Sequence, residues 1–144
     1  MKLRLKTIRR INDYTQNDIA KLLNVTQRTY SKYETGELSI KINQLVILSN
    51  FYKVSTDYLL GLKEKDDIIF KPKIYEENVL IKNLKYLRYE HDYSQKRLSE
   101  LINCSASLIS MTERQESTIQ IDMLVALAKL YNKSIDYLLF SKDN

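Results

Sequence analysis

The strongest constraint on the fold of this chain is an internal repeat. Shifted by 79 positions, the sequence aligns with itself without a gap, and about 22 of 58 paired positions are identical. A period of this length indicates two copies of one domain, because solenoid repeats are much shorter. The alignment predicts a first domain at residues 1–62, a linker at residues 63–79 and a second domain at residues 80–144.

Each copy divides into five patterns of apolar residues at helical spacing. In the first copy we place the helices near residues 2–12, 16–23, 27–34, 43–52 and 56–61, and in the second copy they begin near residues 77, 95, 106, 122 and 135. The chain has only 2 Gly and 1 Pro, so few tight turns are available. No segment alternates with a period of two. The expected fold class is therefore all-α, with two tandem five-helix domains.

The stretch at residues 15–36 is expected to form two short helices joined by a tight break. Thr15 is placed to cap the first helix, with the Asp18 carboxylate near its exposed N–H groups. Asn24 suits the left-handed conformation that ends a helix, and Thr26 can cap the next one. The break therefore positions the second helix across the first.

The second of these helices has one apolar face and one polar face. Tyr30 and Tyr33 are expected to point inward, and the outward residues are Gln27, Arg28, Thr29 and Lys32. Amide, guanidinium and ammonium groups on a short helix held across another helix suit the reading of base edges in a DNA major groove.

The charge of the chain is concentrated in its first part. The net charge is +5, and residues 1–62 alone hold ten Lys/Arg against five Asp/Glu. Such a field favours nucleic acid or another anionic surface, although a merely solubilising surface explains it equally well. The single Cys excludes an internal disulfide, and the sequence has neither a membrane-spanning apolar run nor a signal peptide. These features predict a cytoplasmic protein with no membrane association.

Several short motifs of the first copy match one family. They are Thr15-Gln16, Ile19-Ala20, Val25-Thr26, Tyr33-Glu34-Thr35-Gly36 and the run from Asp57 to Gly61. Together they resemble the lambda-repressor-like, Xre-type helix-turn-helix domain, in which five helices present a DNA-reading unit made of helices 2 and 3. The resemblance covers residues 1–62 and about 80–140, which is nearly all of the chain outside the linker.

This resemblance implies a set of DNA contacts in the first copy. Gln16 would bond a phosphate, Thr26, Gln27, Arg28 and Lys32 would face bases, Thr29 would meet a phosphate or a thymine methyl, and Thr35, Gly36 and Lys41 would hold the other strand's backbone. The alternative is that these residues form only a solvated face. The family pattern also implies internal ion pairs, Arg9 with Glu34 and Arg88 with Glu113.

The second copy differs from the first where the family reads DNA. Gln27, Arg28 and Lys32 are replaced by Ala106, Ser107 and Met111, and Gly36 is replaced by Gln115. The third helix of this copy has a nearly uncharged outward face. Weaker DNA contacts are expected there from Gln95, Arg97 and Ser105. The second copy is therefore expected either to add backbone contacts or to serve in assembly.

Other chemistries find little support. His91 is the only histidine and lacks partners at ligand spacing, so we expect a surface residue and no metal site. Cys104 aligns with Val25, which is expected to be buried, so Cys104 is expected to be a small core residue. No phosphate-binding Gly loop and no nucleophile–base pair is present, so we expect neither an enzyme nor a cofactor.

The sequence thus predicts sequence-specific binding of double-stranded DNA, in a transcriptional repressor or regulator that acts as a homodimer. The alternative is a protein-interaction module of the same fold, such as an antitoxin or anti-repressor. Ala106, Met111 and the apolar linker residues 68–70 favour that alternative, and we expect the linker residues to dock within the chain.

Overall fold

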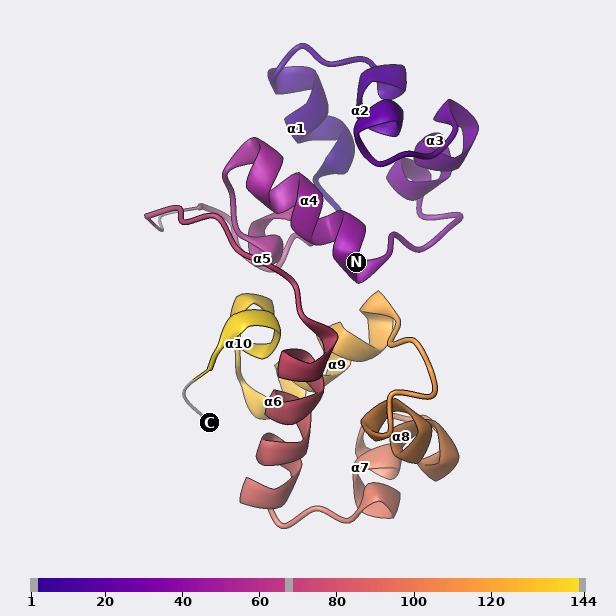
Figure 1. The fold of residues 1–144 in the computed structure, drawn as a ribbon, viewed down its shortest axis with the longest axis vertical. Coiled ribbons are helices and arrows are strands. Elements are labelled where there is room, and N and C mark those ends of the chain that lie inside the picture. Colours follow the sequence, from indigo (N-terminus) through magenta and orange to yellow (C-terminus); the bar gives the residue numbers. More distant parts are fainter. Residues whose placement is uncertain (1–2, 67–68, 143–144) are drawn as a thin grey trace. The chain divides into compact units, whose positions relative to one another are not determined.

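The computed structural model describes residues 3–66 and 69–142. These residues contain ten helices and no strand, which confirms the predicted all-α class (Figure 1). The chain separates into two compact units, residues 1–73 and residues 74–144. Each unit contains five helices, as two tandem five-helix domains require.

Unit 1 follows the predicted helix order closely. Its helices are α1 (Leu5–Ile11), α2 (Gln16–Leu22), α3 (Gln27–Thr35), α4 (Ile42–Tyr52) and α5 (Thr56–Leu59). Its core is formed by fully buried side chains from all five helices: Leu5, Ile19, Tyr30, Leu45, Leu48 and Leu59. α1 and α2 both pack on α3, so the core fixes the position of that helix.

Unit 2 repeats this order. Its helices are α6 (Glu77–Glu90), α7 (Gln95–Leu101), α8 (Ala106–Glu113), α9 (Ile121–Tyr131) and α10 (Ile135–Phe140). α6 begins inside the range expected to be a linker and is twice as long as α1, with 14 residues against 7. It packs on α8 and α10, and its buried residues include Leu80 and Leu87.

Helix ends explain how the chain turns with so little glycine. A Ser or Thr hydroxyl accepts a backbone hydrogen bond at the start of six helices, at Thr15, Thr26, Ser55, Ser94, Ser105 and Ser134. Left-handed residues recur at matched positions of the two units, in the pairs Asp13 and Asp92, Asn24 and Asn103, Gly36 and Gln115, and Lys53 and Asn132. Asn and Asp tolerate this conformation better than most residues, so they replace glycine at most of these turns.

The connecting residues correct one expectation. Ile69 does not dock within the chain, because 89% of its surface is exposed, and only Phe70 is partly covered. Ile68 lies outside the described residues. None of the described helices is both long and apolar enough to cross a membrane.

Candidate nucleic-acid interface

The predicted capping residues stand at the starts of α2 and α3. The Thr15 hydroxyl accepts from the Asp18 N–H at 3.0 Å, and the Asp18 carboxylate accepts from the Thr15 N–H at 2.8 Å. This reciprocal capping box lowers the pKa of Asp18, because the backbone N–H of Thr15 stabilises the ionised carboxylate. Asn24 takes the expected left-handed conformation, with φ of 56°. Thr26 then caps α3 through the Thr29 N–H at 3.1 Å.

The inner face of α3 is aromatic. Tyr30 and Tyr33 are buried, as predicted, and their rings meet edge to face at 6.4 Å between centroids. Burial raises the pKa of Tyr30, so its hydroxyl stays neutral. Because this face is fixed in the core, the opposite face of α3 must point to solvent.

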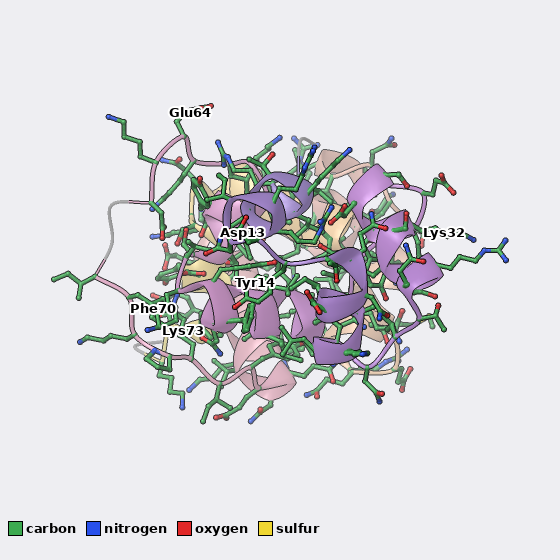
Figure 2. All side chains as sticks on the ribbon, turned by 90° about the horizontal axis from the view of Figure 1, so that it is seen from above. Asp13, Tyr14, Lys32, Glu64, Phe70 and Lys73 are labelled. Atoms are coloured by element: carbon green, nitrogen blue, oxygen red, sulfur yellow. The ribbon has the colours of Figure 1, made fainter. Side chains whose placement is uncertain are left out.

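The outer face of α3 carries the residues expected to meet DNA. Thr26, Gln27, Arg28, Thr35 and Gly36 are exposed, and Thr29 and Lys32 are half-buried. Figure 2 shows Lys32 at the outer margin of unit 1, away from Tyr14. The structure therefore brings these residues onto one surface. Lys41 is also exposed and stands at the start of α4.

A buried ion pair ties this surface to α1. The Arg9 Nε and Nη2 atoms donate to the two Glu34 carboxylate oxygens at 2.7 and 3.1 Å. The side chains are 11% and 2% exposed. Burial disfavours the ionised carboxyl, but the hydrogen bonds from Arg9, Tyr30 and Gln16 together with the charge of Arg9 outweigh burial and lower the pKa of Glu34. Both groups are charged, and Arg9 also donates to the Tyr14 carbonyl at 2.9 Å.

The ion pair extends to the surface through two glutamines, a connection that sequence reasoning missed. Gln16 Nε2 donates to Glu34 Oε1 at 3.0 Å, and Gln27 Nε2 donates to Gln16 Oε1 at 2.7 Å. From the sequence, each glutamine is predicted to contact DNA on its own, Gln16 at a phosphate and Gln27 at a base. Only their spacing across the α2–α3 turn could have suggested that they bond each other. The chain of bonds orients the Gln27 amide at the start of α3.

The turn after α3 places backbone groups beside the same surface. Gly36 has φ of 81°, which favours glycine, and a Cβ built there would meet no atom within 4 Å. The Thr35 hydroxyl donates to the Lys32 carbonyl at 3.2 Å and accepts from the Glu37 N–H at 3.4 Å. The backbone N–H of Lys41 donates to Gln44 Oε1 at 3.2 Å, which fixes the backbone of Lys41.

Unit 2 keeps the buried ion pair of this site, but Ser107 and Met111 replace the cationic residues Arg28 and Lys32. Arg88 and Glu113 form the matching ion pair at 2.7 and 2.8 Å. Gln95 reaches Glu113 only at 3.5 Å, and Ala106 has no amide to extend the chain of bonds. Met111 stands 38% exposed where unit 1 has Lys32. Arg97 and Ser105 are exposed, but Arg97 pairs with Glu100 at 3.4 Å.

The remaining candidates offer no second site. Exposed His91 lies against Tyr93 and Tyr131, and its Nδ1 is 2.8 Å from the Leu87 carbonyl. Cys104 is only partly buried, as is Val25, so the expectation of a core position is wrong for both. These residues precede a helix cap at the surface. Within the described ranges, no three His, Cys, Asp or Glu side chains gather to hold a metal ion.

Comparison with known proteins places both units in one family. A family model for the helix-turn-helix, HTH_3, matches residues 5–59 and again residues 84–138. Three Bacillus subtilis relatives are similar to parts of the chain. The uncharacterized HTH-type transcriptional regulator YobD is 32% identical over 76 residues, which is 53% of this chain and 64% of YobD.

The HTH-type transcriptional regulator ImmR is 44% identical over 61 residues, which is 42% of this chain and 48% of ImmR. The SPbeta prophage-derived uncharacterized regulator YonR is 42% identical over 57 residues, or 40% and 53% of the two chains. The matches thus span about half to two thirds of these relatives. No solved structure gives a significant match.

Proposed function

Because this chain belongs to the helix-turn-helix family in both of its halves, we propose that it is a DNA-binding regulator of transcription in which unit 1 reads the sequence. α3 would enter the major groove. Gln27 would bridge an adenine and Arg28 a guanine, while Lys32 would reach a base one turn further along. Such bidentate pairs each discriminate between bases by about 1–3 kcal/mol.

The remaining residues of the surface would position α3 on the duplex. Gln16, Thr29, Thr35 and Lys41 would bond phosphates, with Thr29 also able to meet a thymine methyl, and Gly36 would let the backbone approach closely. Thr26 would face a base at the start of α3. The phosphate contacts carry no sequence information, but they set the orientation in which Gln27 and Arg28 meet the bases.

The observation that carries the proposal is the fixed orientation of this polar surface. The Gln27 amide is bonded to Gln16, which is bonded to the buried Glu34. A surface that served only for solubility would need no such link to the core. The exposed Arg28 beside it supplies a cation in the same place.

Unit 2 would contribute less to base reading, with weaker backbone contacts from Gln95, Arg97 and Ser105. Reading a two-fold symmetric site needs two competent helices about 34 Å apart. We therefore propose a homodimer that supplies a second unit 1. Sedimentation of the chain with a duplex holding two half-sites tests this step, and a 1:1 complex at all concentrations would contradict it.

Selection of duplexes from a random pool tests the function. The full chain should enrich one motif, and R28A should relax the preference at one or two of its positions. S107A, the matched change in unit 2, should enrich the same motif as the unmodified chain. Failure to enrich any motif would favour the interaction-module alternative, in which the fold binds another protein.

A further inference from the structure

The connection between the units (residues 63–76) is held against α4 by the side-chain amide of Asn50. Asn50 Nδ2 donates to the Lys73 carbonyl at 2.7 Å, and Asn50 Oδ1 accepts from the Lys73 N–H at 3.1 Å. One amide therefore satisfies both backbone groups of one residue, as a neighbouring strand would. This pairing does not depend on the identity of the Lys73 side chain.

Two further contacts hold the beginning of the same connection. The Asp66 carboxylate accepts from the Ser55 N–H at 3.2 and 3.3 Å, at the start of α5. Glu64 lies 3.6 Å from the Arg4 guanidinium, although it is almost fully exposed and adds little. The described residues on both sides of positions 67–68 are thus attached to unit 1.

We infer that the connection is an intramolecular ligand of α4, and that its docking shortens the tether between the two units to residues 74–76. α6 begins at Glu77, so four Cα–Cα steps separate it from Lys73. They span at most about 14 Å. A connection released from Asn50 but still held by Asp66 would be a tether of residues 67–76, which extends to at most about 40 Å, with a root-mean-square length of about 18 Å.

This docking is a property of unit 1 alone. The residue of α9 that matches Asn50 is Lys129, which is exposed and has no amide. Because the two units are otherwise built on the same plan, a lysine at this position is compatible with the fold. The amide of Asn50 is thus the specific element that docks Lys73.

The consequence for DNA rests on the proposed function. A short tether confines the positions that unit 2 can take once unit 1 is bound, so it raises the effective concentration of unit 2 at a neighbouring stretch of duplex and excludes distant ones. Release of Lys73 from Asn50 would widen this range. The docked connection would thus limit how the second unit adds contacts.

Trypsin cleavage of the free protein tests the docking without any DNA. Trypsin cannot cut the Lys71–Pro72 bond efficiently, so cleavage after Lys73 reports release of the docked residue. N50A should speed this cleavage at least about fivefold, whereas N50K, which installs the residue of unit 2 and with it a new trypsin site, is used only for the distance measurement. N43A, an exposed asparagine on the same helix, should leave the rate unchanged.

Distance measurement between the units gives the second readout. Spin labels at K6C and K129C, both exposed positions, are placed in a C104S background. N50K and N50A should broaden the distance distribution relative to the N43A control, while the melting temperature of each variant confirms folding. Unchanged cleavage and unchanged distance width would overturn the inference, whether or not the protein binds DNA.

Discussion

At the scale of single residues, the side chains that α3 turns outward decide what unit 1 can bind. Gln27 and Arg28 stand together at its exposed start, and Gln27 is bonded to Gln16. In the proposed complex they would discriminate between bases, while phosphate contacts elsewhere would supply most of the affinity. The two kinds of contact can therefore be separated by substitution.

The substitutions Q27A and R28A should each weaken binding to a selected duplex by about 1–3 kcal/mol, roughly five- to 150-fold, and leave binding to a random duplex nearly unchanged. Fluorescence anisotropy titrations on the two duplexes measure the difference. S107A in unit 2 is the matched control and should alter neither. Equal losses on both duplexes would show that these residues do not read bases.

Glu34 ties α3 to α1 through its buried ion pair with Arg9. E34Q leaves the Arg9 guanidinium buried without its counter-charge, and the expected loss of stability is about 3–5 kcal/mol. Urea unfolding followed by amide signals of unit 1 measures it. E37Q, a change at an exposed carboxylate on the same turn, should shift stability by less than about 0.5 kcal/mol. A small effect of E34Q would mean that the pair is dispensable.

The same pair predicts the acid sensitivity of unit 1. The pKa of Glu34 is lower in the folded state than its usual value of about 4.3, so the folded state favours the ionised form. The stabilisation is fully present above that usual value and is lost as the pH falls through the lowered one. Unfolding free energies of unit 1 between pH 7 and pH 2 should show this fall. E34Q should lack it, and an identical profile would refute the assignment.

At the scale of helices and turns, the residues that end α3 in unit 1 and follow α8 in unit 2 can be compared directly. Gly36 and Gln115 occupy matched positions with φ of 81° and 58°. Left-handed backbone costs a residue with a Cβ about 1–2 kcal/mol relative to glycine. G36A should therefore destabilise unit 1 by that amount, and Q115G should stabilise unit 2. Thermal unfolding resolved by unit measures both, and shifts of the same sign would contradict the strain argument.

Much of the helical architecture could be predicted from sequence because its signals are local. Thr15, Asn24 and Thr26 act on their own neighbours, so the bounds of α2 and α3 follow from caps and spacing. The bond between Gln16 and Gln27 depends on two rotamers across a turn, and the docking of Lys73 on Asn50 joins residues 23 apart. Contacts of this kind leave no periodic trace. The exposure of Ile69 was missed because an apolar residue does not reveal whether a partner is within reach.

At the scale of the whole molecule, duplication has produced two copies of one scaffold with different surfaces. Both keep the buried Arg–Glu pair, through Arg9 and Glu34 in unit 1 and Arg88 and Glu113 in unit 2. Only unit 1 presents amide and cationic groups on its third helix. The two units thus share a scaffold and differ in surface, which supports the proposal that unit 1 alone carries sequence preference.

Equilibrium titration of the unmodified chain, R28A and S107A with a selected duplex and a scrambled one, at 50 and 200 mM salt, tests this proposal most directly. R28A should lose about five- to 150-fold of the preference for the selected duplex, and S107A should keep all of it. We predict that the selected duplex binds at least about a thousandfold more tightly, and that both affinities fall steeply with salt as phosphate contacts release counterions. Equal affinity for the two duplexes, or no binding to either at 50 mM salt, would contradict it.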